Sequence, residues 1–392
     1  MVAIPQTYNH GVRRIIDDAG KRPIATLNST VIGIIGTAPD ADAELFPLDK
    51  PSAILGSDTA VAALGLTGTL PAALNSIFKV QPCRVVVVRV DEGVDDAGTI
   101  TNVIGGVDAA TMQRTGMYAL LNSNSRLSLW PRILIAPGFS HELAVLTEMM
   151  IIADRLRGWV ISDAPDTNSV AAVAYRENFS DKRAFGPCFP HFIVRGSDGS
   201  DEMRWASAFK AAALVKQHYE KNFAWAASNM VIDGVIGTTA DIDYVNGDPA
   251  CEANYLNENA VTTIIRDGGF RIWGVRTCAT GFDERWRFEN GVVVDDIIGD
   301  SIVAAARRLV DHNITRTFFD DLVDMTNDYL SQKVTEEVII GGKAWATGEL
   351  NSPSNLALGK AFINYDLQWA TPAEDINLIS NVNPEYFTSL FE

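Results

Sequence analysis

The sequence predicts a large α/β region followed by a smaller α+β domain, with an extended arm at each end of the chain. Three observations lead to this fold class. Short β-branched runs alternate with amphipathic helical stretches through most of the 392 residues, two long helical patterns follow near the C-terminus, and both termini alternate like strands without a local hairpin partner. We place the four parts at residues 1–24, 25–280, 281–370 and 371–392, and an alternative divides the α/β region again near residue 100.

Composition is that of a globular protein with an acidic surface. Hydrophobic residues make up 47% of the chain and charged residues 21%, which is enough apolar material for a buried core. The net charge is 32 minus 49, or −17, which argues against a body that wraps nucleic acid or lies on an anionic membrane. The N-terminus lacks the apolar segment of a signal peptide, and no stretch reaches the roughly 18 apolar residues of a membrane helix. We therefore expect a cytoplasmic product that inserts into no membrane.

The first strands of the α/β region are recognised by their short apolar runs. Residues 30–38, TVIGIIGTA, are β-branched and are followed by Pro39, which is typical of a buried strand. Helical patterns follow at residues 57–64 and 71–78. Residues 84–90, RVVVVRV, are almost continuous valine, as in a strand that helices cover on both faces. This order predicts a parallel sheet.

The same alternation continues through the middle of the chain. We expect strands at residues 132–136, 159–162 and 189–195, separated by helices at residues 141–156 and 168–179. These segments extend the parallel α/β layer.

A helix and a hairpin are expected to complete the α/β region. Ser200 is a good N-cap residue and two acidic residues follow it, so we predict that a helix begins there. Strand-like residues 260–266 and 270–277 flank the turn Asp267-Gly268-Gly269. This spacing predicts a β-hairpin that closes the α/β region.

The smaller domain combines two long helices with two strands. The helical patterns cover residues 295–311 and 315–333, and strand-like residues follow at 338–346. The last strand, residues 361–369, alternates apolar and polar side chains. One of its faces is almost wholly apolar and consists of Ala361, Ile363, Tyr365, Leu367 and Trp369.

Both termini resemble strands that need a partner from another chain. Side chains alternate over residues 12–16, and beyond Pro372 a second alternation extends to residue 382. Strand addition to another sheet edge would satisfy the backbone groups of such segments. We expect the arms to contact neighbouring copies through Val12, Arg13, Arg14, Ile15, Ile376, Leu378 and Val382.

The two arms carry opposite charges. Residues 1–24 have four basic and two acidic side chains, a net charge of +2, whereas residues 371–392 have four acidic side chains and no basic one, a net charge of −4. We hypothesise that arms of adjacent subunits meet in one shared sheet, where this complementarity selects the partner more than it adds affinity. The alternative is two solvated tails.

Motifs for catalysis and ligand binding are incomplete. Ser140 and His141 are adjacent, but the surrounding GFSHE fails the G-x-S-x-G elbow at its last position, and Ser140 is better explained as a helix N-cap. The GIIG at residues 33–36 lacks the glycine spacing of a dinucleotide site. The loop 241–252 resembles a calcium loop, but Val245 occupies a ligand position.

The remaining polar residues have structural explanations. Adjacent acids such as Asp295 and Asp296 are expected on a solvated helix face. His191 and His218 are expected to be satisfied structural histidines. The four cysteines are scattered, which fits reduced thiols better than disulfides or zinc ligands. The sequence therefore predicts no catalytic residue, no metal site and no cofactor.

Five segments of the chain carry a family resemblance. They are HGVR at residues 10–13, DADAELFPLDKP at 40–51, YRENFS at 175–180, LNENAVTTIIRDGGFRIWGVRTC at 256–278 and GKAFINYDLQWATPAEDI at 359–376. In this order they resemble the contractile tail sheath proteins of temperate myophages. The resemblance covers nearly the whole chain, from about residue 8 to about residue 380.

The resemblance implies a fold, a location and a set of partners. It implies an outer α/β domain, subtilisin-like in fold but without a protease triad, and an inner C-terminal domain that faces a tail tube. Such subunits are assembled in the host cytoplasm and form stacked hexameric rings around the tube of the virion tail. The sheath contracts after the baseplate contacts the host and drives the tube through the envelope. The implied partners are further copies of the chain, the tail tube protein, and the baseplate and tail terminator proteins.

The resemblance also suggests roles for particular residues. The arms would add strands to sheets of neighbouring subunits, with Ile363, Tyr365, Leu367 and Trp369 in the acceptor strand. One long helix could contact the tube, and the basic residues available for this contact are Arg307, Arg308, Arg316 and Lys333.

Two alternatives to a phage sheath remain open at this point. R-type bacteriocins use a similar sheath without a capsid. An α/β hydrolase with an unrecognised site would have the same layered region but would tolerate removal of its arms.

Overall fold

One mixed sheet forms the centre of the α/β part. A computed structural model of the protein describes residues 23–56, 58–196, 198–280 and 285–390. The sheet has six strands in the order β2-β3-β1-β6-β7-β8, and all neighbours are parallel except β2 and β3. Its strands are β1 (Ile32–Thr37), β2 (Pro51–Leu55), β3 (Arg84–Val90), β6 (Ile133–Ile135), β7 (Trp159–Asp163) and β8 (Ala184–Cys188).

Helices cover both faces of this sheet, as the valine run of β3 predicts. Alternate residues of β3 belong to different apolar clusters, with Val85 and Val87 on one face and Val86 and Val88 on the other. Neither face contacts water, so both can be apolar. The first cluster includes residues of α2 (Thr69–Val80) and α7 (Ala206–Glu220), and the second includes residues of α3 (Asp96–Ile104), α5 (Leu143–Leu156) and α6 (Ser169–Arg176).

Short elements complete this part of the chain. Helix α1 (Asp58–Ala62) packs near α2, and the 3₁₀ helix η1 (Gly116–Asn122) and α4 (Ser123–Leu127) precede β6. The strands β4 (Gly106–Val107) and β5 (Arg114–Thr115) form a small hairpin. The four cysteines are free and buried, as expected for reduced thiols.

Two three-stranded sheets lie beside the main sheet. One has the order β10-β9-β12 and the other β11-β14-β13. The predicted hairpin at the turn 267–269 is confirmed as β13 (Thr263–Arg266) and β14 (Phe270–Trp273), which belong to the second small sheet. Its flanking residues Thr262 and Thr277 form isolated bridges to β8 at the edge of the main sheet. The other members are β9 (Phe192–Arg195), β10 (Asp201–Arg204), β11 (Met230–Val231) and β12 (Val235–Thr238), and α8 (Glu252–Glu258) precedes β13.

The prediction that a helix begins after Ser200 is wrong. Residues 201–204 form β10, an edge strand that pairs antiparallel with β9, and α7 begins only at Ala206. The Ser200 hydroxyl donates to Asp198 Oδ1 at 2.6 Å instead of capping a helix. The Ser200 carbonyl accepts from the Gly196 amide at 2.8 Å, which closes the β9–β10 turn. A local capping signal was therefore overridden by pairing with a strand that precedes it in the chain.

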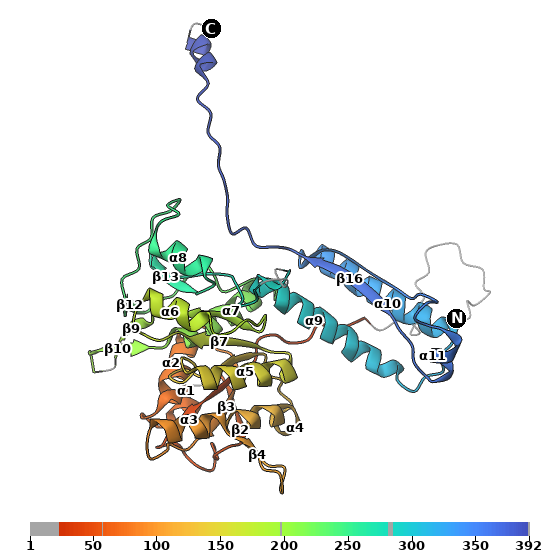
Figure 1. The fold of residues 1–392 in the computed structure, drawn as a ribbon, viewed down its shortest axis with the longest axis horizontal. Helices are drawn as coiled ribbons and strands as arrows, with labels where there is room; N and C mark the ends of the chain where they lie inside the picture. Colours follow the sequence, from red (N-terminus) through yellow and green to blue (C-terminus); the bar gives the residue numbers. More distant parts are fainter. Residues whose placement is uncertain (1–22, 57, 197, 281–284, 391–392) are drawn as a thin grey trace, which may run out of the picture.

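The C-terminal lobe, residues 285–370, packs two long helices against a two-stranded antiparallel sheet. It contains α9 (Glu289–Ala306), the short 3₁₀ helix η3 (Arg307–Leu309), α10 (Arg316–Thr335), β15 (Ile339–Trp345), α11 (Pro353–Ala357) and β16 (Asn364–Trp369). Figure 1 shows this lobe extending away from the α/β body, which we define as residues 30–278, with α9 leading from one to the other. Helix α9 begins earlier than the predicted residue 295, so Asp295 and Asp296 lie inside it.

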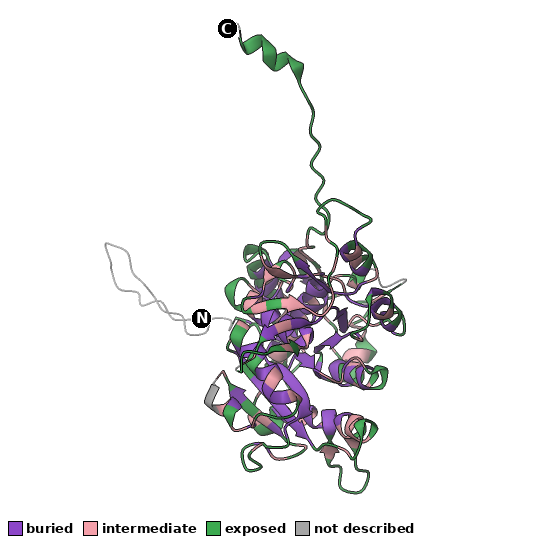
Figure 2. Ribbon diagram, turned by 90° about the vertical axis from the view of Figure 1, so that its left-hand side faces the viewer, coloured by how far each residue is buried: buried purple, intermediate pink, exposed green. Residues whose placement is uncertain are grey.

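Both ends of the described chain are attached to the C-terminal lobe. Ile24 is buried in the core, the Leu27 amide donates to Ser301 Oγ at 3.0 Å, and the Thr26 hydroxyl lies 3.2 Å from that of Tyr329. At the other end, the C-terminal arm, residues 371–390, leaves the lobe after β16 and projects into solvent (Figure 1, Figure 2). The predicted strand in this arm is not formed in the single chain, and its end forms the short 3₁₀ helix η4 (Pro384–Leu390).

We expect His218 to make the fold sensitive to acid. Its Nδ1 lies 2.9 Å from Ser29 Oγ, and burial lowers the pKa of His218 to about 4, against about 6.5 in the unfolded chain. As the pH falls from 6.5 to 4, the unfolded state takes up a proton that the folded state does not. The free energy of unfolding should therefore fall by about 3 kcal/mol over this range through this residue, with no further loss below pH 4.

Urea unfolding at pH 7, 5.5 and 4 measures this contribution. His218→Gln should unfold with a shallower pH dependence than the unsubstituted protein, whereas His312→Gln, at an exposed position, should leave the dependence unchanged. Equal slopes for the protein and His218→Gln would contradict the prediction.

Candidate functional site

A serine, an aspartate and a histidine meet beyond β6 and β7, yet they are enclosed by protein. Asp163 Oδ2 lies 3.3 Å from Ser140 Oγ and accepts from Ser207 Oγ at 2.5 Å. His191 Nδ1 lies 3.7 Å from Asp163 Oδ1. All four side chains are fully buried, so no substrate can reach a nucleophile here. The group instead ties β7 to the start of α7.

The buried aspartate in this group explains why Ser140 is not a helix N-cap, contrary to the sequence prediction. Glu142 occupies the N-cap position of α5, while Ser140 Oγ accepts from the Asp163 amide at 2.9 Å. Burial raises the pKa of Asp163, and the charge of His191 and the hydroxyl of Ser207 oppose that rise. These hydrogen bonds therefore compensate the Asp163 carboxyl group for the contacts with water that it loses on burial.

Neither metal ligands nor a membrane helix occur in the part of the chain that the structure describes. No three His, Cys, Asp or Glu side chains gather there in a way that could hold an ion. Over the same residues, no helix has the length and apolar character needed to cross a bilayer.

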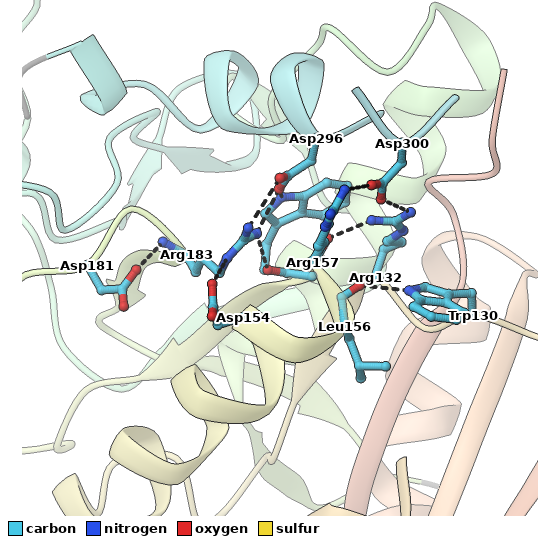
Figure 3. Close-up of polar contacts among 11 residues, drawn as sticks. Trp130, Arg132, Asp154, Leu156, Arg157, Asp181, Arg183, Asp296 and Asp300 are labelled. Atoms are coloured by element: carbon cyan, nitrogen blue, oxygen red, sulfur yellow. Dashed lines mark hydrogen bonds and ion pairs between the residues drawn. The ribbon is translucent and has the colours of Figure 1, made fainter. Parts of the chain in front are cut away.

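An arginine clasp on α9 makes polar contacts between the two parts of the chain. Figure 3 shows Asp296 and Asp300, one helical turn apart, facing Arg132, Arg157 and Arg183 from the α/β body. Arg183 Nη1 lies 2.8 Å from Asp296 Oδ2, and Arg132 Nη2 lies 2.5 Å from Asp300 Oδ2. Arg157 also pairs with Asp300. These ion pairs hold α9 against the α/β body.

The centre of the clasp is the buried pair of Arg183 and Asp296, whereas Arg157 is half-exposed. Arg183 and Asp296 are 9% and 8% exposed, and the indole of Trp159 donates to Asp296 Oδ2 at 2.9 Å. Burial alone would lower the pKa of Arg183, but the hydrogen bonds and charges of Asp296 and Asp154 outweigh it and raise the pKa. The expectation that Asp296 lies on a solvated helix face is therefore wrong, because its partners come from segments more than a hundred residues away in sequence.

A second buried ion pair holds the beginning of α9. Lys210 Nζ lies 2.6 Å from Glu289 Oε1, and both side chains are 1% exposed. The same ammonium donates to Thr262 Oγ1 at 2.7 Å. The pair joins α7 to the first residue of α9, so the two parts of the chain are linked at the start of this helix as well as along it.

The predicted arm residues fall into two groups. Those of the N-terminal arm, Val12, Arg13, Arg14 and Ile15, lie outside the described residues. Those of the C-terminal arm are exposed, at 74% for Ile376, 92% for Leu378 and 97% for Val382. Side chains this exposed are not packed against the other described residues.

The predicted acceptor strand lies at the edge of the lobe's sheet. Strand β16 pairs with β15, and its other edge has no strand partner among the described residues. Leu367 and Trp369 pack against the core, whereas Tyr365 is more exposed. Ile363 precedes the strand and is partly buried.

The four basic residues proposed for a tube contact do not form one group. Arg307 and Arg308 in η3 and Arg316 at the start of α10 are exposed near the same turn. Lys333 lies near the other end of α10, about 26 Å away at 1.5 Å per residue. The assignment of Lys333 to a tube contact needs a correction, because its side chain is only 4% exposed and its ammonium pairs with Glu336 at 2.5 Å. Residue type alone could not reveal that this lysine faces the core.

The chain is similar to known tail sheath proteins over nearly its whole length. Residues 113–278 match the family model of the phage tail sheath protein central domain. The chain is 33% identical over 387 residues to a prophage major tail sheath protein of Pseudomonas aeruginosa strain UCBPP-PA14, which covers 98% of this chain and 99% of that relative. It is 33% identical over 392 residues to the tail sheath protein of Escherichia phage P2, with 98% of each chain covered. In fold it resembles the helical sheath of the anti-feeding prophage in the contracted state, with a TM-score of 0.72, 18% identity and coverage of 98% of this chain and 100% of that one.

Proposed function

The chain belongs to the phage tail sheath protein family, and from that premise we propose that it polymerises as stacked hexameric rings around a tail tube and contracts to drive the tube through the host envelope. Its relatives are structural proteins and not enzymes, so the hydrolase alternative is wrong. In this proposal the subunit is assembled in the host cytoplasm and ends in the virion tail. Its partners are further copies of itself, the tube protein, and the baseplate and terminator proteins.

The observation that carries this proposal is that one chain has both an exposed C-terminal arm and an open sheet edge. The arm exposes the apolar side chains of Ile376, Leu378 and Val382 to water. Burial of these side chains by a partner would be favourable. Strand β16 offers unpaired backbone groups of the kind that strand addition satisfies. One subunit therefore has both the donor and the acceptor that a helical polymer needs, and a heterologous contact of this kind repeats along the polymer.

We propose that four parts of the chain have different roles in the sheath. Residues 25–280 form an outer domain with a subtilisin-like fold, and residues 281–370 form the inner domain that faces the tube. Residues 1–24 and 371–392 are the arms. The described ends of the chain support this arrangement, because residues 24–27 and Ala370 both contact the C-terminal lobe. Both arms thus start from the inner domain of their own subunit.

For the tube contact we retain Arg307, Arg308 and Arg316 and leave out Lys333. The three arginines are exposed at one end of the lobe, where a charged partner surface can reach them. They would act mainly in orienting the subunit, because rim charges affect specificity and association rate more than affinity.

Contraction would then move each subunit as one body while the arms stay joined. The arginine clasp and the Lys210–Glu289 pair support this view, because they tie the lobe to the α/β body at several points of α9. Rigid bodies connected by flexible segments can change their packing without unfolding. Electron microscopy of the concentrated chain, alone and with the tube protein, tests the proposal. Tubes or ring stacks support it, and isolated particles under both conditions contradict it.

We predict that Arg13→Glu combined with Arg14→Glu strongly impairs polymerisation and leaves the subunit folded. The substitutions change the N-terminal arm from a net charge of +2 to −2, so both arms become acidic and repel where they meet. Sedimentation at low salt measures the polymerised fraction, and circular dichroism checks the fold.

The control for these reversals places the same charge change on the body. Lys50→Glu with Lys79→Glu alters two exposed lysines and should leave polymerisation nearly unchanged. Normal sheath from the Arg13 and Arg14 variant would contradict the pairing of the arms.

A further inference from the structure

The C-terminal arm is fixed to its own subunit for a short distance beyond β16. The indoles of Trp369 and Trp286 stack with their centroids 5.3 Å apart. Gly291 of α9 lies against the indole of Trp369, and a β-carbon at residue 291 would come within 2.7 Å of that ring. Asn290 Nδ2 donates to the Ala370 carbonyl at 2.7 Å. The chain is therefore held as far as residue 370.

Glu374 makes the next contact, and it is a bidentate one. Arg276 Nε lies 2.5 Å from Glu374 Oε1, and Arg276 Nη2 lies 2.9 Å from Oε2. Arg287 Nη2 lies 3.5 Å from Glu374 Oε2. The Arg276 and Glu374 side chains are only 19% and 30% exposed. Bidentate pairs of this kind fix direction as well as adding stability.

The segments that carry the two arginines are also held by contacts that do not involve the arm. Arg276 Nη1 donates to the Glu258 carbonyl at 3.0 Å, which orients the guanidinium group. The segments that carry the arginines pair with each other, since the Thr277 amide donates to the Arg287 carbonyl at 2.8 Å. The carboxylate thus pairs with an Arg276 guanidinium that another contact also orients, so less side-chain entropy is lost on pairing.

The fixed part of the arm ends at Glu374. Asp375 bonds only within the arm, to Asn377 Nδ2 at 3.0 Å. Among the described residues, no hydrogen bond or ion pair joins residues 375–390 to the rest of the chain, and all of them are exposed. Figure 2 shows this part of the arm extending away from the body.

We propose that Glu374, held by Arg276 and Arg287, is the anchor that fixes where the C-terminal arm leaves its own subunit, so that only the chain from Asp375 onward reaches a neighbour. This rests on the proposed exchange of arms and adds a positioning residue to it. A fixed exit point confines the free segment and raises its effective concentration at the neighbouring sheet edge. It also removes Glu374 from the charge that can attract a partner arm, which leaves −3 instead of −4.

The anchor can be measured in the unassembled subunit by the distance between two spin labels. The native cysteines are buried, so labels can be directed to Asn377→Cys in the arm and Glu177→Cys on the body, both exposed positions. We expect one narrow distance distribution. Glu374→Gln should add a broad one, with the released population rising about tenfold, the factor expected for losing one charge-assisted interaction.

Two further substitutions distinguish the anchor from a general loosening of the arm. Glu385→Gln makes the same chemical change at an acid that has no contact with the body and should leave the narrow distribution unchanged. Arg276→Gln should also broaden it, and the double variant should be no broader than Glu374→Gln, because that substitution already removes the pair with Arg276.

Polymerisation of the same variants separates this inference from the proposed function. If the anchor positions the arm, Glu374→Gln should need about tenfold more subunit to polymerise. A broad distribution with unchanged polymerisation would overturn the role in assembly, and an unchanged distribution would overturn the anchor itself. A chain that never polymerises, even with the tube protein, would contradict the proposed function, while the distance measurement would still decide whether Glu374 holds the arm.

Discussion

Removal of residues 371–392 is expected to abolish polymerisation while the rest of the chain stays folded. The truncation removes no core residue, because the arm is exposed and Trp369 and Ala370 remain. Among the described residues its polar links to the rest of the subunit are the partly exposed pairs of Glu374 with Arg276 and Arg287, and losing them costs only about 1 kcal/mol. The polymer, in contrast, would lose every strand that this arm donates. Electron microscopy and light scattering measure assembly, and thermal unfolding measures the fold.

A substitution with a matched control tests whether the apolar side of the arm is responsible. Replacing Ile376, Leu378 and Val382 with Asp should prevent polymerisation in the full-length chain, because these side chains would be buried in the neighbour's sheet. Replacing Leu66 and Val94 with Asp alters equally exposed apolar residues on the α/β body and should be tolerated. Polymers of normal length from the truncated chain would contradict the exchange of arms.

Asp296→Ala should cause the largest loss of stability among single substitutions at the domain junction. It leaves the buried guanidinium of Arg183 and the indole of Trp159 without their shared acceptor. Removing one partner of a buried ion pair costs more than the pair contributes, because the remaining buried charge loses compensation. Arg183 would keep its ion pair with the exposed Asp154, but not the buried partner. We expect the free energy of unfolding to fall by about 3 kcal/mol, as measured by urea unfolding at neutral pH.

Asp320→Ala is the matched control for this prediction. Asp320 lies on the exposed side of α10, 3.8 Å from Arg316, and its side chain is 64% exposed. Its loss should change the free energy of unfolding by no more than about 0.5 kcal/mol. If Asp296→Ala were no more destabilising than Asp320→Ala, the arginine clasp would not be what holds α9 on the body. Loosening of the clasp should also reduce polymerisation, because the lobe would no longer follow the body.

The contrast between local and distant interactions explains which elements the sequence predicts correctly. The strand at residues 84–90 and the hairpin around Gly268 follow from continuous valine and an Asp-Gly-Gly turn, signals that act over a few residues. Thr315 caps α10 at the predicted start of that helix, which is again a local signal. The edge strand at residues 201–204 was missed because its pairing with β9 competes with a local capping signal that points to a helix.

Only part of the candidate site could be predicted from local sequence patterns. An unpaired, strand-like terminal arm is a local property, so the sequence alone suffices to propose Ile376, Leu378 and Val382 as contacts. The roles of Asp296 and Glu374 could not be inferred in this way, since an acid beside other acids is most often solvated. Their arginine partners lie elsewhere in the sequence, at Arg183 and Arg276.

Most of the elements and the layered α/β region follow from the sequence, because hydrophobic periodicity and turn chemistry are encoded within short segments. The tertiary structure alone decided which charges are internal. Asp296, Lys333 and Glu374 look alike to a reader of the sequence as surface charges, yet each is bound within the subunit. Whether a charged side chain is solvated or paired depends on segments that meet only after the chain has folded, and its energy changes accordingly.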